Sequence, residues 1–86
     1  MTKSLHTTDY AALVEILVDA RKRSGKTQQE IAEALGKPQS YVTKIENGER
    51  RLDVVEFIDL SIAMGVEPPT LFKRLVGTIA ASGGDQ

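Results

Sequence analysis

Hydrophobic residues recur at three- and four-residue intervals in five segments of the chain, and glycine or proline separates these segments. The spacing predicts five amphipathic helices, and no strand is evident. The first helix is expected from Thr8 or Asp9 to Ser24, with Gly25 as its stop. Its apolar residues form one arc of the helical wheel: Tyr10, Leu13, Val14, Ile16, Leu17 and Ala20. Arg21 lies inside this arc, so its guanidinium group needs a partner if it points at the core.

Two short helices joined by a tight turn are predicted in the middle of the chain. Thr27 and Glu30 have the spacing of a capping box, in which each side chain bonds the backbone N–H of the other residue. Gly36 ends the first helix, because glycine adopts the left-handed conformation of a helix cap at little cost. Residues 38–47 form the second helix, since Pro38 suits a first helical turn.

The second helix of this pair has two unlike sides. Its apolar side chains lie together, where they dock on the protein: Tyr41, Val42 and Ile45. The other side presents amide, hydroxyl and ammonium groups: Gln39, Ser40, Thr43, Lys44 and Asn47. A merely solvated helix face usually carries mixed glutamate and lysine, whereas this side has no acid at its centre. Such groups read base edges in the DNA major groove, so we call residues 38–47 the reading helix.

Two strongly apolar helices complete the pattern. Asp53 and Glu56 have the spacing of a second capping box, and the helix that follows ends at Gly65. This helix is apolar nearly all round, so we expect it to be buried as a central strut. The last helix opens at residues 67–69, and its N-terminal half should close the domain. One edge of it is interpreted as a dimer interface, with a simple core stripe as the alternative: Phe72, Val76 and Ile79.

The composition is that of one small globular domain. The 86 residues are 41% hydrophobic and 27% charged, and no apolar run is long enough to span a membrane. We assign residues 8–81 to the domain, residues 1–7 to a disordered N-terminus and residues 82–86 to a flexible tail. The sequence has no cysteine and shows no export signal, which indicates a cytoplasmic protein.

The net charge of the chain is −1, but the charges are unevenly distributed. Residues 20–51 contain eight basic and four acidic side chains, which gives this part a net charge of +4. The remainder has three basic and eight acidic side chains, a net charge of −5. The positive potential therefore lies around the two short helices, as a DNA-binding module requires; chance clustering on a solvated surface is the alternative.

The two short helices and the loop after them resemble a known family. The runs T-Q-Q-E-I-A-x-x-L-G from Thr27 and Q-S-Y-V-T-K-I-E-N-G-E-R-R from Gln39 are similar to DNA-binding domains of the Cro and lambda-repressor type, the XRE-type helix-turn-helix family. The similarity extends from about Leu13 to Leu75. It implies a compact, all-α, five-helix lambda-repressor-like domain that binds operator DNA, usually as a dimer. The chain departs from the pattern at Pro38, where many members have a serine or threonine that caps the reading helix.

The resemblance implies roles for individual residues around the reading helix. The residue matching Gln28 commonly contacts a phosphate. The residues that commonly face base edges match Gln39, Ser40 and Lys44, to which we add Thr43 from the same polar side. Phosphate contacts are expected from residues on and around the reading helix: Gln28, Lys37, Tyr41, Asn47, Arg50 and Arg51. For the two arginines, a solvated turn is the alternative.

The resemblance also supplies a partner for Arg21. In the family pattern R-x-x-x-G, which matches Arg21 and Gly25, the arginine typically pairs with the glutamate of I-E-N-G, here Glu46. Glu46 lies between the apolar and polar sides of the reading helix, so it can reach inward. An Arg21 that extends to solvent or to a phosphate is the alternative.

These features predict a sequence-specific DNA-binding regulator, a small bacterial or phage repressor or controller that binds a two-fold symmetric operator as a homodimer. Signs of an enzyme are missing, since His6 is the single histidine and no phosphate-binding loop follows a strand. We expect no cofactor and no metal. Two alternatives remain: an antitoxin-like protein that binds its operator and also a toxin or other co-regulator, and a helix-turn-helix interaction module that does not read DNA. The polar residues of the reading helix argue against the second.

Overall fold

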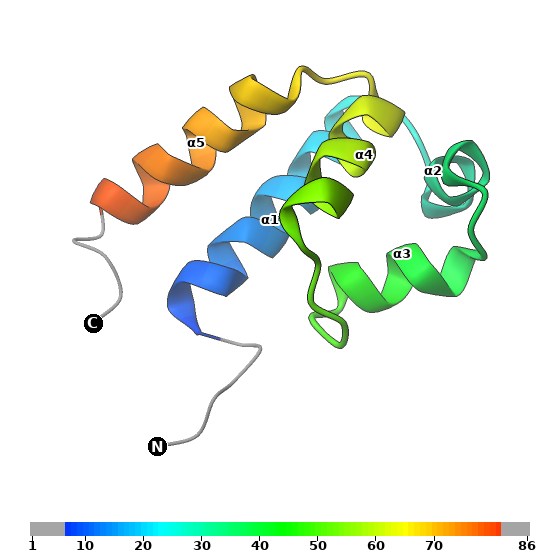
Figure 1. Cartoon of the computed structure of the whole chain (residues 1–86), viewed down its shortest axis with the longest axis horizontal. Helices are drawn as coiled ribbons and strands as arrows, with labels where there is room; N and C mark the ends of the chain where they lie inside the picture. Colours follow the sequence, from blue (N-terminus) through cyan, green and yellow to red (C-terminus); the bar gives the residue numbers. More distant parts are fainter. Residues whose placement is uncertain (1–6, 82–86) are drawn as a thin grey trace.

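The computed structural model describes residues 7–81, and these form five α-helices and no strand (Figure 1). The helices are α1 (Thr8–Arg23), α2 (Gln28–Leu35), α3 (Gln39–Glu46), α4 (Val54–Met64) and α5 (Pro68–Ala81). The all-α, five-helix class predicted from the sequence is therefore confirmed. The N-terminal segment and the tail, apart from Thr7, lie outside the described residues, and so does His6.

Local sequence signals determine where the helices begin and end. The hydroxyl of Thr7, a residue assigned above to the N-terminal segment, caps α1 by accepting a hydrogen bond from the N–H of Tyr10 at 3.2 Å. Capping boxes start α2 and α4, as their spacing predicted: Thr27 with Glu30, and Asp53 with Glu56. Gly36 and Gly65 end the same two helices with φ of 68° and 79°, a conformation that a residue with a Cβ atom avoids.

The reading helix, α3, is one residue shorter at each end than predicted. Pro38 is the N-cap residue rather than the first helical residue, and it makes no side-chain cap hydrogen bond. Its side chain has no acceptor, so the first N–H groups of α3 lack the kind of cap that Thr27 supplies to α2. Asn47 is the C-cap residue.

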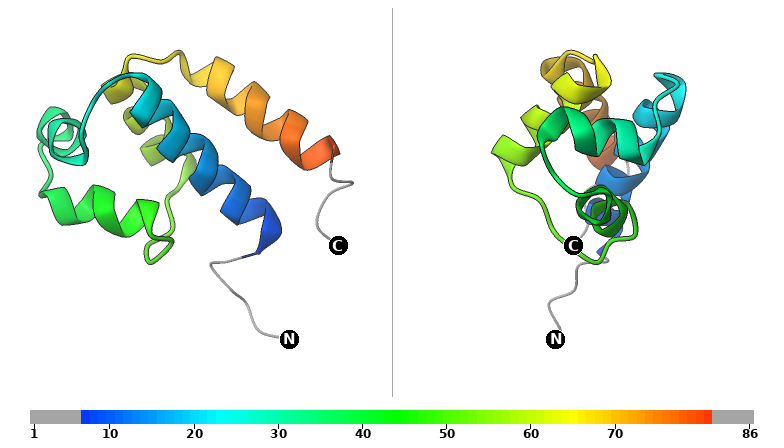
Figure 2. Two further views of the ribbon diagram at one scale, coloured as in Figure 1. Left: turned by 180° about the vertical axis from the view of Figure 1, so that it is seen from behind. Right: turned by 90° about the vertical axis from the view of Figure 1, so that its right-hand side faces the viewer.

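The five helices pack in two groups on either side of α1. α5 lies beside α1 and antiparallel to it, while α2 and α3 lie on the other side of α1 (Figures 1 and 2). α4 packs against α1, α2 and α5, so it links the two groups. This arrangement leaves α3 at the surface, with one side on the body of the protein (Figure 1).

The core forms where these helices meet. Its buried side chains come from all five helices: Ile16, Leu17, Ala20, Ile31, Ala32, Val42, Ile45, Phe57, Leu60, Met64 and Leu71. Val42 and Ile45 of α3 are 2% and 1% exposed. Burial of such a side chain stabilises a fold by about 1.5–3 kcal/mol, so these two residues hold α3 in a fixed orientation on the core.

The prediction that α4 is buried nearly all round is wrong. One side of the helix faces the core through Phe57, Leu60 and Met64. The opposite side carries four β-branched residues that are between 40% and 64% exposed: Val54, Val55, Ile58 and Ile62. These four lie within about 100° of one another on the helical wheel, so they form a continuous stripe. The packing of α4 against α1, α2 and α5 leaves this stripe uncovered.

The start of this stripe adjoins α5, because Val54 and Phe72 line the same pocket. Phe72 and Val76 are 51% and 49% exposed, and the Phe72 ring meets the Phe57 ring edge-on with the centroids 6.3 Å apart. Ile79, the third residue of the predicted dimer interface, is partly buried. We call the exposed residues of the two helices the α4–α5 apolar face: Val54, Val55, Ile58, Ile62, Phe72 and Val76. So many large apolar side chains on one face are typical of a surface that binds another protein.

Candidate nucleic-acid interface

The side chains predicted to read bases lie on the outward side of α3. Gln39, Ser40 and Lys44 are exposed, and Thr43 is partly exposed. Val42 and Ile45 point the opposite way, into the core. The major groove of B-DNA is about 12 Å wide and admits an α-helix, so the polar side of α3 can reach base edges while its apolar side stays buried.

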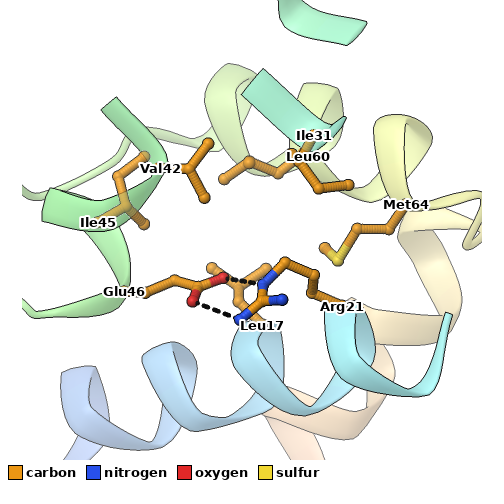
Figure 3. Close-up of a pocket in the computed structure, with 8 residues that line it drawn as sticks. All are labelled: Leu17, Arg21, Ile31, Val42, Ile45, Glu46, Leu60 and Met64. Carbon is orange, nitrogen blue, oxygen red and sulfur yellow. Dashed lines mark hydrogen bonds and ion pairs between the residues drawn. The ribbon is translucent and has the colours of Figure 1, made fainter. Parts of the chain in front are cut away.

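A partly buried charged pair lies beneath α3, at the edge of the core. Arg21 of α1 and Glu46 of α3 form two hydrogen bonds, from Nε to Oε2 at 2.7 Å and from Nη2 to Oε1 at 3.0 Å (Figure 3). The side chains are 13% and 9% exposed, and the third nitrogen of Arg21, Nη1, donates to the Lys26 carbonyl at 2.9 Å. Apolar residues surround the pair: Leu17, Ile31, Val42, Ile45, Leu60 and Met64 (Figure 3). The hydrogen bonds to Glu46 raise the pKa of Arg21, so the guanidinium stays charged. This is the pair that the family resemblance implied.

Gln28 connects this pair to the outward side of α3. Its Nε2 donates to Glu46 Oε1 at 2.8 Å, and its Oε1 accepts from Thr43 Oγ1 at 2.6 Å. Gln39 Nε2 lies 3.5 Å from the same oxygen, which makes a weaker bond. Sequence reasoning expected Gln28 to contact a phosphate and missed these hydrogen bonds. Their partners lie 11 to 18 residues apart, and the inward position of Glu46 was the only signal for them.

Three of the predicted phosphate-contacting residues gather on another side of α3. Tyr41 is partly buried, and its ring centroid lies 5.2 Å from the Lys37 ammonium and 4.7 Å from the Arg50 guanidinium. Arg50 is also paired with Glu56 of α4, at 3.2 Å between Nη1 and Oε1 and 2.9 Å between Nη2 and Oε2. Sequence reasoning did not place Glu56 in the site.

The cluster changes the acid–base properties of its members. The hydrogen bonds from Arg50, together with one from the N–H of Asp53, lower the pKa of the Glu56 carboxyl to about 2. Burial, followed by the nearby charge of Glu56, raises the pKa of Tyr41, so the phenol is neutral at physiological pH. The cluster therefore contains two cations and one anion around a neutral ring.

Tyr10 anchors the loop that follows α3. Its hydroxyl accepts a hydrogen bond from the N–H of Leu52 at 3.2 Å and donates to the carbonyl of Arg50 at 3.4 Å. The guanidinium of Arg51 lies over the Tyr10 ring, 4.3 Å from its centroid. The loop with both arginines is thereby held against α1. Asn47, the C-cap residue of α3, is exposed, and its Nδ2 lies 3.5 Å from Glu49 Oε2.

Known proteins share this sequence pattern and this fold. A helix-turn-helix family model matches residues 17–71. An XRE-family like protein from Pseudomonas syringae pv. tomato str. DC3000 is 47% identical, with a TM-score of 0.78 over 81% of this chain and 85% of that chain. The restriction-modification controller protein C.AhdI from Aeromonas hydrophila is 30% identical, with a TM-score of 0.64 over 71% of this chain and 92% of that chain. These matches define a helix-turn-helix protein. The chain belongs to the XRE-type helix-turn-helix family of DNA-binding regulators.

A more distant structure shares the fold alone. The controller protein C.Esp1396I, solved as a tetramer in complex with its natural 35-base-pair operator, has a TM-score of 0.77 over 87% of this chain and 99% of that chain. The two sequences are 19% identical. No curated protein matches the chain.

Within residues 7–81, no group of three or more His, Cys, Asp or Glu side chains is placed to hold a metal ion. Every buried side-chain nitrogen or oxygen of these residues has a hydrogen-bond partner. None of the five helices combines the length and the apolar character that crossing a membrane requires.

The buried pair should be a large contributor to stability. Glu46→Ala leaves the Arg21 guanidinium without its carboxylate partner in an apolar environment, so we expect the free energy of unfolding to fall by about 3–5 kcal/mol. The control is Asp19→Ala, which removes the partner of Arg23 at 3.0 Å and of Arg74 at 3.3 Å among side chains that are 42% to 76% exposed. That change should cost less than about 1 kcal/mol. Urea denaturation measures both changes in the free energy of unfolding. Equal small effects would contradict the expectation that the Arg21–Glu46 pair contributes more than an exposed pair.

Glu56 should make stability sensitive to acid. Its pKa in the folded protein is about 2, below its ordinary value of 4.5, so the carboxylate stabilises the fold at pH values above 4.5. This contribution is lost as the pH falls from about 4.5 towards 2. Glu56→Gln should therefore lower stability at pH 7 and reduce the loss between pH 5 and pH 2. Urea midpoints across this range test it, with Asp59→Asn as the control, because it removes an exposed carboxylate of the same helix that lies outside the Arg50–Glu56 pair.

Proposed function

We propose that this protein is a sequence-specific transcriptional regulator that inserts α3 into the DNA major groove and binds a two-fold symmetric operator as a homodimer. The observation that carries the proposal is the polar outward side of a helix whose other side is buried: Gln39, Ser40, Thr43 and Lys44. Glutamine pairs with adenine and lysine with guanine, while hydroxyl groups bond several bases. The net charge of +4 in residues 20–51 attracts DNA to this part of the protein.

Phosphate contacts are proposed for residues in and around α3: Gln28, Lys37, Tyr41, Asn47, Arg50 and Arg51. Arg50 can bind a phosphate without leaving Glu56. Its Nη1 and Nη2 atoms hold Glu56, and Nε has no hydrogen-bond partner among residues 7–81. The Nε–H and the second Nη2–H lie along one edge of the guanidinium and match two phosphate oxygens. The Tyr41 ring, 4.7 Å away, keeps the guanidinium plane in place.

Related proteins support a regulatory role. C.AhdI and C.Esp1396I are both restriction-modification controller proteins, and C.Esp1396I was solved on its operator DNA. By analogy with them, we propose that the protein is a small repressor or controller that acts on bacterial or phage DNA in the cytoplasm. The choice of operator is proposed to depend on the side chains on the outward side of α3.

Homodimerisation is proposed through the α4–α5 apolar face. Two residues of the edge that the sequence singled out, Phe72 and Val76, lie in this face, and α4 adds four more exposed apolar residues. A second copy of the chain is the favoured occupant, because two reading helices about 34 Å apart reach successive major grooves on one side of DNA. A toxin or another co-regulator on this face is the alternative.

Base-reading and phosphate-contacting residues should respond differently to substitution. In-vitro selection of bound DNA fragments, followed by sequencing, should first recover a two-fold symmetric operator. Lys44→Ala should then relax the preference at one position of each half-site and cost about 1–3 kcal/mol on the preferred sequence. Arg51→Ala should weaken binding to all sequences alike and reduce the salt slope by about one.

Lys73→Ala is the matched control for these two variants, because Lys73 is an exposed cation on α5, away from α3. It should leave both the sequence preference and the salt slope unchanged. If Lys44→Ala lowers the salt slope and leaves the preference intact, Lys44 contacts a phosphate and the assignment of α3 is wrong. If no DNA sequence is enriched, the chain is an interaction module rather than a DNA-reading regulator.

The dimer proposal predicts that a charge on the α4–α5 apolar face separates the subunits. Ile58→Glu and Phe72→Glu should give monomers in analytical ultracentrifugation at concentrations where the natural protein is a dimer. Thr78→Glu, which adds the same charge at an exposed position on another side of α5, should remain dimeric. A natural protein that is monomeric at every concentration, both free and on DNA, would rule out the homodimer.

A further inference from the structure

In the hydrogen bonds beneath α3, the charge of Glu46 determines which group donates and which accepts. Both oxygens of Glu46 accept hydrogen bonds from Arg21, and Oε1 also accepts from Gln28 at 2.8 Å. A carboxylate ion can only accept, so the group of Gln28 that faces it must be the amide NH2. The ion pair thereby determines the orientation of the Gln28 side-chain amide, with Nε2 toward Glu46.

The same reasoning continues from Gln28 to α3. With its nitrogen at Glu46, Gln28 turns its amide oxygen to Thr43, whose Oγ1 lies 2.6 Å away. This distance is that of a good O–H···O hydrogen bond. An amide oxygen can only accept, so Thr43 must donate its single hydroxyl hydrogen to Gln28. Thr43 then has no hydrogen-bond donor left for a base.

What remains of Thr43 limits the bases that it can face. The hydroxyl and the methyl group branch from the same carbon atom, so with the hydroxyl hydrogen donated to Gln28 the side chain can offer a base its methyl group, and its oxygen only as an acceptor. In the major groove a methyl group packs favourably on the C5-methyl of thymine. Guanine presents only the acceptors N7 and O6 there, which meet no donor from Thr43.

We propose that Thr43 reads thymine through its methyl group and rejects guanine, because the chain of hydrogen bonds from Arg21 through Glu46 and Gln28 uses up its only donor. Gln28 is thus a specificity-determining residue that acts through Thr43, in addition to any phosphate contact. This inference rests on the proposed function, since it concerns which base α3 selects at one position of the operator.

Two conservative changes at Thr43 separate the roles of its two groups. Thr43→Val keeps the methyl shape and removes the hydroxyl, whereas Thr43→Ser keeps the hydroxyl and removes the methyl. Competition binding is measured on the selected operator with each of the four bases at each half-site position. Thr43→Val should keep the preference for thymine over guanine within about twofold, and Thr43→Ser should reduce it by up to about tenfold. The opposite result, or a preference that both variants retain, would overturn the proposal.

A change at Gln28 tests the direction of the hydrogen bonds. Gln28→Ala removes the acceptor and frees the Thr43 hydroxyl, which can then donate to N7 or O6 of guanine. Discrimination against guanine at that position should fall several-fold. The double variant Gln28→Ala/Thr43→Val should again discriminate against guanine, because it has no hydroxyl group that could donate to N7 or O6.

Thermal unfolding followed by circular dichroism establishes that each variant is folded before its binding is compared. If Gln28→Ala is unstable, the two single changes at Thr43 decide the proposal. Equal guanine discrimination in the natural protein and in a folded Gln28→Ala variant would contradict it. A natural protein that binds DNA without sequence preference would instead overturn the proposed function, so the two failures are distinguishable.

Discussion

The ion pair between Arg21 and Glu46 is the interaction on which the rest of the molecule depends. It joins the first helix to the end of the reading helix inside an apolar environment, with bonds of 2.7 and 3.0 Å. A buried pair of this kind adds little net stability compared with apolar residues of the same volume, but loss of one partner is expensive. Its more specific effect is directional. The hydrogen bonds of a charged pair require donors and acceptors at fixed positions, whereas apolar contacts have no preferred direction.

Helix boundaries were predictable from the sequence because their causes are local. Capping boxes at Thr27 and Asp53 and left-handed glycines such as Gly36 act within four residues, so the printed order of residues contains the whole signal. Burial of α4 was mispredicted for the opposite reason. Helical periodicity identifies apolar positions such as Val55 and Ile62, but coverage depends on how many other elements pack around the helix. The other four helices leave one side of α4 open.

The candidate site shows the same division between local and distant causes. The polar side of α3 could be predicted, since helical spacing alone separates Gln39 and Lys44 from Val42 and Ile45. The Arg21–Glu46 pair came from the family resemblance and from the apolar position of Arg21. The Arg50–Glu56 pair and the Gln28–Thr43 bond were missed, because each joins residues from different elements. No periodicity places such partners together. Only the packing of α2 on α3, and of the loop on α4, does so.

Stability and recognition are coupled in this domain because α3 is so short. Its eight residues supply both the core contacts and the outward side, and Glu46 and Thr43 belong to a single chain of hydrogen bonds. Under the proposed function, a substitution at Gln28 therefore changes the chemistry that Thr43 offers to a base without altering α3 itself. Conversely, a new side chain at position 43 alters the partners of a residue that contacts the buried ion pair. New operator preferences are consequently easier to reach at Gln39, Ser40 and Lys44, whose side chains are exposed and bear less on the core.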